Sequence, residues 1–526
     1  MGSYFQGLPA RNELRYYIVI AKFILRSNML KQFIEKYDRQ IQRGLEILPG
    51  VITWTFITSP VWAGLFFPEA MAYVVIFFAL YWFCQSARIA RGIFVSYRQM
   101  KKDTNRDWLS DCQKHPDFEK IQHLVIIPTY KEPLHTLERT LEGFKRQTFP
   151  KKRMHLVLAQ EEREGEAGRQ KMEALVKKFG STFAHLWVTY HPDIPGEVKG
   201  KSSNMAWAGK WAKKKLVDEL GYALEFIILS ANDADSIFHP RHLSCVTHKF
   251  LSLPQTERHL KFFQAAIVFY NNLWRVPFPV RIRSATSSVI EVGRLATPQD
   301  MHPFSAYSVS LRAVHNAGYW AVNVVPEDYD LFYRCFFAHQ GKMDVEPIFL
   351  FARQDAAEST TFWGTIKNHY QQVRRWAYGV SADPYVVKQS LTHSEIPLPA
   401  RLYRLLLLGD CHFLWAAKSF IPFGSFVALL VNPTFSQTVL AHNLPQIAST
   451  LFKSCFLFTI ALIAVDVVIR PAHPKNYSKK KLFLISVFDW FLSPTVGLLF
   501  SVLPAIDAHT RLMLGKYLEY KVTEKV

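Results

Sequence analysis

Two uncharged apolar stretches near the start of this 526-residue chain limit what it can fold into. Residues 51–67 and 70–87 contain no charged side chain, and only Pro68 and Glu69 separate them. A stretch of about 17–25 apolar residues is long enough to cross a bilayer as a helix. Arginines and lysines flank the pair on both sides, which predicts a transmembrane hairpin with both ends in the cytosol.

The same apolar pattern returns toward the C-terminus. Residues 413–431 and about 447–469 are predicted to be two further spans. The loop 432–446 contains no lysine or arginine, whereas the next loop, "RPAHPKNYSKKK", is strongly basic. The positive-inside rule then places the first loop outside and the second loop inside.

Residues 482–503 leave two alternatives. The segment is apolar enough to span, but it holds Asp489 and a central Pro494 and lies between a basic loop and a lysine-rich end. Crossing once would put that end outside, against the charge rule. We favour a re-entrant or interfacial segment. This predicts a multi-pass plasma-membrane protein with four spans, and with its soluble part and both termini in the cytosol.

Between the membrane segments the sequence has the pattern of a soluble α/β domain. Short apolar runs bounded by turn residues predict strands buried on both faces, and the polar stretches between them predict crossover helices. The five runs are "HLVIIP", "MHLVLA", "AHLWVTY", "EFIILSAND" and "KFFQAAIVFY".

The composition narrows the classes of partner. The net charge is +20, which positive-inside loops and anionic lipid head groups explain. No nucleic-acid-binding motif accompanies the charge, so a nucleic-acid partner is not expected. The six cysteines form no CxxC pair, which argues against a disulfide framework or a zinc site.

The first chemical motif is Asp233-Ala234-Asp235, which directly follows an apolar run. Two carboxylates at i and i+2 beyond a strand can share Mg²⁺ or Mn²⁺ with a diphosphate, because these cations prefer oxygen ligands. The alternative is a polar turn that caps a helix, since DxD also occurs often by chance.

Two upstream loops suit a nucleotide. "PTYKEP" places Thr129, Tyr130 and Glu132 beyond the first predicted strand, where open α/β sheets bind ligands. "GEVKGKSSNMAWA" places Lys199 and Lys201 at a helix start, where backbone amides and ammonium groups suit phosphate. The alternatives are an ordinary strand exit and a solvated basic loop.

"EDYDL" offers Glu327, Asp328 and Asp330 after another apolar run. A carboxylate that accepts the proton of an attacking sugar hydroxyl provides general-base catalysis. The alternative is that these residues only open a helix, because acidic side chains complement its dipole.

"QQVRRWAYG" combines Arg374, Arg375 and Trp376 just before the second membrane region. An arginine presents paired donors to a diphosphate, and a tryptophan stacks on sugar rings. The alternative is anchoring at the lipid interface, with the arginines on head groups and the tryptophan in the aromatic belt.

In this order, with QVRRW fitting QxxRW, the motifs make the chain resemble the membrane-integrated, processive family-2 glycosyltransferases, the group of cellulose, chitin and hyaluronan synthases. The resemblance covers about residues 50–526. It implies an α/β GT-A fold, a nucleotide-activated sugar donor, Mg²⁺ or Mn²⁺ as cofactor, and inversion at the anomeric carbon.

The resemblance also implies roles for individual residues. Asp235 would hold the metal with the diphosphate, Asp328 would be the general base, and Trp376 would lie under the terminal sugar of the acceptor. The side chains expected to bind the nucleotide sugar are Thr129, Glu132, Lys201, Asp233, Gln372 and Arg375.

The C-terminal tail is similar to the FxVTxK gating loop of cellulose synthases, with Tyr520 in place of the phenylalanine. Thr523 and Lys525 would close over the donor, and the alternative is a frayed terminus.

Two positions depart from the family pattern. The family usually has an aspartate at the end of the second strand that contacts the base, whereas "HLVLAQEERE" offers Gln160, Glu161 and Glu162, which leaves the donor nucleotide open. Pro326 replaces the usual threonine before ED.

The predicted function is an inverting glycosyltransferase that uses a UDP-sugar to extend a β-linked polysaccharide, coupled to export through the membrane. The alternative is transfer of a single sugar to a lipid carrier or glycolipid. The expected partners are the UDP-sugar donor, a growing glycan or lipid-linked acceptor, and membrane lipids.

Four spans are few for a complete channel, which would then need a second copy of the chain or a partner. A transporter or anchor that only binds nucleotide would leave the carboxylates without a role.

The predicted organisation has six parts. They are a cytosolic amphipathic segment (1–48), a transmembrane hairpin with an interface helix (49–102), a GT-A domain (117–352), interface helices with QxxRW (353–400), two transmembrane helices (401–470), and a basic loop with the re-entrant or interfacial segment and tail (471–526).

Overall fold

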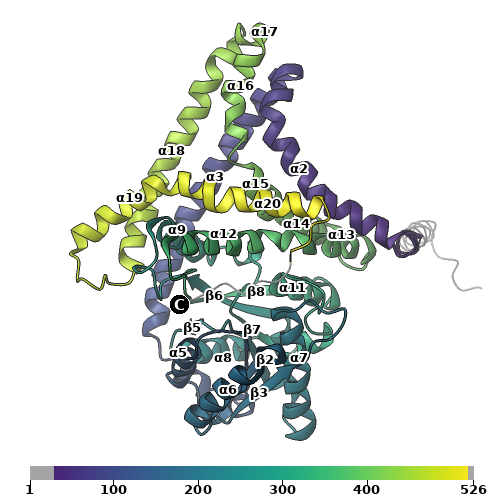
Figure 1. The fold of residues 1–526 in the computed structure, drawn as a ribbon, viewed down its shortest axis with the longest axis vertical. Coiled ribbons are helices and arrows are strands. Elements are labelled where there is room, and N and C mark those ends of the chain that lie inside the picture. The colour runs from purple at the N-terminus through teal and green to yellow at the C-terminus, as the bar shows by residue number, and fades with distance from the viewer. Residues whose placement is uncertain (1–28, 519–526) are drawn as a thin grey trace, which may run out of the picture.

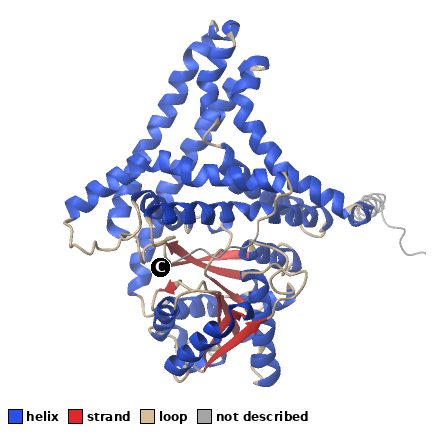
Figure 2. Cartoon of the chain, viewed as in Figure 1, coloured by secondary structure: helices blue, strands red, loops and turns tan. Residues whose placement is uncertain are grey.

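The computed structural model describes residues 29–518, and these residues form three layers (Figure 1). All of the strands lie in an α/β domain at one end of the molecule (Figure 2). A bundle of long helices forms the other end, and further helices run across the molecule between the two.

One mixed sheet forms the centre of the α/β domain, with the strand order β3-β2-β1-β4-β7-β6-β8-β5. Strands β3, β2, β1 and β4 are parallel, and β7 is antiparallel to both of its neighbours, β4 and β6. The strands are β1 Gln122–Thr129, β2 Met154–Glu161, β3 His185–His191, β4 Ile227–Ala231, β5 Ile237–Phe238, β6 Lys261–Val268, β7 Tyr307–Ser310 and β8 Asp344–Arg353.

The five apolar runs of the sequence form β1, β2, β3, β4 and β6, as predicted. The other three strands were not expected from the sequence. β5 and β7 have only 2 and 4 residues, too few for a periodic pattern. β8 is longer, but charged and partly exposed positions interrupt its apolar side chains. The antiparallel β7 makes the sheet mixed.

Both faces of the sheet are covered by helices, which explains why the central residues of β1, from Leu124 to Ile127, are all apolar. Leu124 and Ile126 point into one core and Val125 and Ile127 into the other, and all four are fully buried. The first core is closed by α7 Lys201–Lys213, α9 Phe278–Arg294 and α11 Glu327–Ala338. The second is closed by α5 Leu134–Lys145, α6 Gly165–Phe179 and α8 His242–Ser252.

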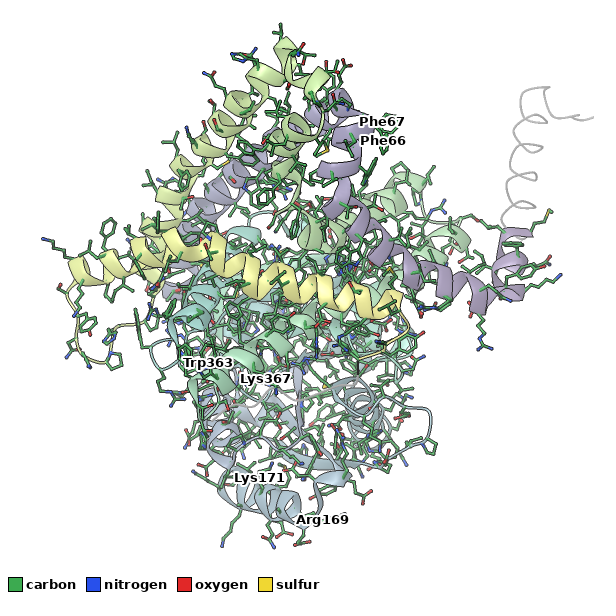
Figure 3. The ribbon with its side chains drawn as sticks, turned by 45° about the horizontal axis from the view of Figure 1, so that its top comes forward. Phe66, Phe67, Arg169, Lys171, Trp363 and Lys367 are labelled. Atoms are coloured by element: carbon green, nitrogen blue, oxygen red, sulfur yellow. The ribbon has the colours of Figure 1, made fainter. Side chains whose placement is uncertain are left out.

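The bundle starts with a helical hairpin, α2 Asp38–Phe66 and α3 Pro68–Asn105, with only Phe67 between the two helices. The 38 residues of α3 rise about 57 Å at 1.5 Å per residue, well beyond a hydrocarbon core of about 30 Å. Its C-terminal half therefore continues past the bundle and packs against α9. Figure 3 shows Phe66 and Phe67 at the tip of the hairpin, far from Arg169 and Lys171 of the α/β domain.

Four helices among the described residues are long and apolar enough to cross a membrane. They are Asp38–Phe66, Pro68–Asn105, Val439–Ile469 and Lys479–Met513. The stretches predicted as spans at 51–67, 70–87 and 447–469 lie within the first three of these helices, except for Phe67 between the first two.

The expected span at 413–431 is not one straight helix. It belongs to a pair, Leu398–Ala417 and Ile421–Val431, that bends by 60°. The second limb rises about 16 Å at 1.5 Å per residue, roughly half of a hydrocarbon core. Pro422 lies just inside that limb and cannot donate a backbone hydrogen bond, which favours a break here.

The loop expected at 432–446 is also shorter than predicted. Helix α18 Val439–Ile469 already begins where Thr438 caps it, with Thr438 Oγ1 accepting from Ala441 N at 3.1 Å. The tips of the bundle meet at this end, because Asn432 Nδ2 donates to the carbonyl of Leu65 at 3.1 Å.

The crossing layer contains the C-terminal helices. α19 Lys479–Gly497 continues through a π-helical turn into α20 Leu503–Met513, and Figures 1 and 3 both show this arm running across the base of the bundle. Helix α12 Phe362–Ala377 lies in the same layer and packs against α20.

A buried ion network joins the layers. The guanidinium of Arg470, at the end of α18, contacts Asp466 and Asp489 at 2.7 Å each. Arg281 of α9 adds a contact of 2.9 Å to Asp489. Both carboxylates are fully buried, so loss of one partner would leave an uncompensated charge at a cost of about 3–5 kcal/mol. Asp489, which is unusual in an apolar segment, therefore fixes α19 to α9 and α18.

Helices α3 and α9 pack closely through a glycine pair. A Cβ at Gly92 would lie 2.4 Å from the carbonyl oxygen of Gly293. We expect Gly92→Ala to force the helices apart and to destabilise the protein by about 1–3 kcal/mol. A matched control is Gly44→Ala in α2, where a Cβ would meet nothing within 4 Å and the helix gains propensity. Thermal unfolding in detergent should show a lower Tm for Gly92→Ala alone. Equal Tm values would contradict the close packing.

Candidate active site

The predicted site residues come from three elements that meet at the carboxyl edge of β1 and β4. Asp233 and Asp235 follow the end of β4, which lies beside β1. Lys201 is the first residue of α7, and Glu327 and Asp328 are the first two of α11. The carboxyl ends of parallel strands are the usual ligand-binding edge of an α/β sheet, so the sheet topology brings these groups together.

Lys201 contacts two carboxylates at once. Its Nζ lies 2.7 Å from Asp233 Oδ1 and 2.5 Å from Glu327 Oε1, and its side chain is 11% exposed. Gly200 precedes it with φ at +154°, a conformation that favours glycine. Val198 N donates to the carbonyl of Val322 at 2.8 Å, which attaches the lysine loop to the segment before α11.

Asp328 is held by backbone donors. Its Oδ2 accepts from Ser305 N at 2.7 Å and its Oδ1 from Tyr329 N at 2.8 Å, and the side chain stays partly exposed. The Ser305 hydroxyl donates to Asp233. Ser305 thus connects the carboxylate expected to hold nucleotide with the one expected to act as base.

Sequence reasoning missed Ser305 and Gln354. Ser305 has φ at +63°, uncommon for a residue other than glycine and typical of functional sites. Gln354 directly follows β8, and its Nε2 donates to Asp233 Oδ2 at 3.2 Å and to Ser236 Oγ at 2.5 Å. Neither residue belongs to a motif, and only recognition of β8 would have pointed to Gln354.

Asp235 is more deeply buried than Asp233. It is 2% exposed, and its Oδ2 accepts from the backbone N of Asp355 at 2.9 Å. Arg139 contacts Asp355 Oδ2 at 2.6 Å, while Asp355 Oδ1 is buried without a hydrogen-bond partner. The carboxylate of Asp235 therefore contacts the backbone of Asp355 beyond the end of β4.

The loop after β1 is closed by Glu132. One oxygen of Glu132 accepts from Thr129 Oγ1 at 2.8 Å and also from the backbone N of Tyr130. Lys131 adopts a left-handed conformation with φ at +65°. The two residues expected to face a nucleoside are thus held in one turn.

The end of β2 contains the residues that depart from the family pattern. Gln160 is 1% exposed, and a Cβ at Gly168 would lie only 1.8 Å from its Nε2. The next residue, Glu161, pairs with Arg163 at 2.5 Å, and the Arg163 guanidinium lies 3.9 Å from the centre of the Tyr130 ring. A shallow depression lies here, lined in part by Glu161, Arg163, His191, Lys199 and Ser203.

The other predicted residues lie at the edges of the site. Lys199 pairs with Asp193 at 2.5 Å on the surface, away from the Lys201 contacts. Asp330 is buried and pairs with Arg334 at 2.5 Å, one helical turn away, which is a structural role.

Helix α12 carries the QxxRW residues. Gln372 is buried, and Trp376 stacks on Phe269, which directly follows β6, with ring centres 5.7 Å apart. Arg374 Nη1 contacts Asp507 of α20 at 2.9 Å. Figure 3 shows the start of α12, at Trp363 and Lys367, beneath the crossing arm. The tail residues Tyr520, Thr523 and Lys525 lie outside the described residues.

Comparison with known protein families identifies the class of enzyme to which this site belongs. Residues 231–465 match the family model described as Glycosyl transferase family group 2. The chain is a glycosyltransferase with a family 2 domain. The match begins at the last residue of β4, so it includes Asp233, Asp235, Asp328 and Trp376 but not β1 to β3. The curled mixed sheet is a GT-A-like fold.

Solved glycosyltransferase structures resemble the chain at low identity. The mannosyltransferase PcManGT from Pyrobaculum calidifontis, in complex with GDP-Man and Mn²⁺, is 14% identical with a TM-score of 0.43, over 76% of this chain and 98% of its own. S. aureus TarS is 12% identical with a TM-score of 0.29, over 64% and 55%. A TarS fragment in complex with UDP-GlcNAc is 13% identical with a TM-score of 0.32, over 76% and 93%. No curated protein gives a significant sequence match.

The buried Glu327 predicts a pH dependence of stability. Burial raises the pKa of its carboxyl from 4.5 to about 7, and Lys201 only partly offsets this. Between these values the folded protein holds a proton that the unfolded chain has released, so stability falls as pH rises. The shift from 4.5 to about 7 corresponds to a change on the order of 3 kcal/mol.

We expect the Tm of the wild type to fall across this window and the fall to be much smaller in Glu327→Gln. The partly exposed Glu142→Gln is the control and should keep the wild-type slope. An unchanged slope in Glu327→Gln would rule out this residue as its source.

Proposed function

We propose that this glycosyltransferase transfers a sugar, with inversion, from a nucleotide-activated donor to a hydroxyl acceptor held beside Trp376. The observation that carries the proposal is the meeting of Lys201, Asp233 and Asp328 at the carboxyl edge of the sheet, linked through Ser305. One cation and two carboxylates at this edge supply the groups for binding a diphosphate and removing a proton.

The donor would bind across β1, β4 and α12. Thr129 and Glu132 would face the nucleoside, and Asp233 and Lys201 would hold the nucleotide. A diphosphate placed here would compete with Asp233 for Lys201, so donor binding would rearrange that ion pair. Gln372 and Arg375 would then hold the leaving diphosphate from the opposite side, where a fixed cation stabilises charge that develops in the transition state. We favour a UDP-sugar, as for the synthases that the motifs resemble.

The carboxylates also suit a divalent cation. No group of three or more metal-ligating side chains occurs among residues 29–518, so a metal would need ligands from the donor. Mg²⁺ is commonly held by one or two carboxylates together with substrate phosphates. Asp235 would hold Mg²⁺ or Mn²⁺ in this way, and the unpartnered Oδ1 of the adjacent Asp355 fits an additional cation. When bound, the metal would neutralise charge on the leaving diphosphate.

Asp328 would act as the general base. Both of its oxygens are oriented by backbone N–H groups, yet the side chain stays partly exposed. It would take the proton of the acceptor hydroxyl as that oxygen bonds to the anomeric carbon. The bond to the diphosphate breaks on the opposite face, and the configuration at that carbon inverts. Asp328 ends protonated, and the diphosphate leaves with the bonding electron pair.

The acceptor would be the end of a growing β-linked polysaccharide stacked on Trp376, with the product passing toward the helical bundle. The α/β domain and both termini would lie in the cytosol. The arm formed by α19 and α20 crosses the base of the bundle in two views, which favours the interfacial alternative for 482–503 (Figure 1). The tail at Thr523 and Lys525 would gate the donor site.

A second candidate is transfer of one sugar to a lipid carrier. Two observations favour it. The limb Ile421–Val431 is too short to complete a span alone, so a closed channel would need a second copy or a partner. Cationic side chains also collect where the bundle meets α9.

Activity tests the proposal directly. Membrane vesicles are offered labelled UDP- and GDP-sugars with Mn²⁺, and the products are separated by size. We expect Asp328→Asn to keep UDP binding and to lose transfer by roughly 10²–10⁴-fold, because the base is gone but the donor contacts remain. The surface carboxylate Asp218, which pairs only with Lys213 among residues 29–518, gives the control Asp218→Asn. Normal turnover in Asp328→Asn would remove this residue from the base role.

The adjacent arginines of α12 give a matched pair of variants. We expect Arg375→Ala to lose turnover, because the leaving diphosphate loses a cation. Arg374→Ala should instead lower the Tm, since it leaves Asp507 with only Arg511 as ion partner. Turnover and Tm are measured for both variants. If Arg375→Ala changed membrane association but not turnover, lipid anchoring would be its role.

A further inference from the structure

Three cations lie at the junction between the bundle and the α/β domain without a role in the proposed reaction. Arg283 and Arg294 belong to α9, and Lys418 lies at the bend before Ile421–Val431. Two carboxylates, Glu291 and Asp410, accompany them. We call these five residues the junction cluster. Ionisable side chains at membrane depth are costly and usually functional.

Helix α3 brings the parts of the junction cluster together. Lys418 Nζ lies 5.2 Å from the ring centre of Trp82, and Asp410 accepts a hydrogen bond from the neighbouring Tyr81. About 15 Å further along α3, at 1.5 Å per residue, Gly92 touches Gly293, the residue before Arg294. Lys418 is within electrostatic range of both arginines of α9.

The charges of the junction cluster do not balance. It holds three cations and two carboxylates, an excess of one positive charge. Arg294 pairs with Glu291 at 3.0 Å, and 54% of its side chain is still exposed. Among the described residues, neither Arg283 nor Lys418 has an ion-pair partner within 4.0 Å or a side-chain hydrogen bond. Burial lowers the pKa of Arg283 to about 10, so it remains charged near neutral pH, and the carboxylate of Glu291 acts on it only from beyond 4.0 Å.

Unpartnered nitrogen atoms point to the same place. Arg283 Nε is buried without a hydrogen-bond partner, as are both ring nitrogens of His369. His369 is 3% exposed, belongs to α12 and lies within electrostatic range of Arg283. Buried polar atoms are nearly always satisfied, so several orphans beside an excess cation indicate a missing anion with acceptor oxygens.

We propose that the junction cluster binds the phosphate group of a membrane lipid. A phosphate supplies the missing negative charge and several acceptor oxygens, whereas a neutral glycan supplies no charge. The cluster connects α9 with the bend at Lys418, and basic sites between membrane helices suit lipid head groups.

The lipid phosphate has two sources. It is either the acceptor of the sugar or an anionic phospholipid that fastens the bundle to the α/β domain. His369 and Trp376 are seven residues apart on α12, about 10 Å, so a head group in the cluster would lie near the proposed acceptor position. Only the assignment as acceptor rests on the proposed function.

The test measures binding by the purified full chain in detergent, without donor. The probes are farnesyl phosphate, dioctanoyl phosphatidylglycerol and neutral farnesol. We expect both phosphate probes to bind and farnesol to bind at least about tenfold more weakly, because charged hydrogen bonds are lost. Lys418→Met and Arg283→Gln should each weaken phosphate binding by a similar factor. Lys418→Arg should keep it. Arg98→Gln, an exposed position of α3 over Phe94, is the control.

Each outcome decides the proposal. Equal binding of farnesol and farnesyl phosphate by the wild type, or unchanged phosphate binding in both neutral variants, would overturn it. UDP binding checks that each variant is folded, and if a variant fails this check the wild-type comparison alone decides. Labelled sugar on farnesyl phosphate would identify the acceptor, whereas binding without transfer would identify a phospholipid site. Because binding is measured without donor, it can succeed even where the proposed sugar transfer fails.

Discussion

Carboxylates can share a protein site only where their charge is compensated, and Lys201 does this at the carboxyl edge of the sheet. Its ammonium group contacts both Asp233 and Glu327, which come from different elements. Backbone N–H groups do the same for Asp328. The positions of α7, α11 and the turn after β4 therefore depend on one another through this ammonium group. A donor diphosphate would compete with these carboxylates, because Lys201 would be attracted to it as well.

The same requirement for charge compensation distinguishes the charged side chains that hold helices together from those that could bind a ligand. Arg470 lies between Asp466 and Asp489, and Arg281 also contacts Asp489, so two arginines balance two carboxylates. A network whose charges balance fixes helices together without a ligand. The junction cluster has one carboxylate fewer than it has cations, and Arg283 Nε has no hydrogen-bond partner. A binding site for an anion has such an uncompensated positive charge before the anion binds.

The sequence was informative where the chemistry is local. Five strands could be predicted from apolar runs, and Lys201, Asp233 and Asp328 from short motifs, because neighbouring residues carry both patterns. Ser305 and Gln354 could not be predicted. Each contacts Asp233 from a distant segment, and the segments come together only through β7 and β8. The bend before Ile421–Val431 was also missed, since hydropathy records length and not direction.

The paired arginines show why the ambiguity of QVRRW could not be resolved from sequence. Adjacent residues of a helix project about 100° apart, so Arg374 and Arg375 face different neighbours. Arg374 pairs with Asp507, more than 130 residues away in the crossing arm. Arg375, one residue on, is the one proposed for the diphosphate. The ion pair with the crossing arm and the role proposed at the diphosphate thus belong to consecutive residues of one helix. The motif alone could not separate them, because Asp507 is distant in the sequence.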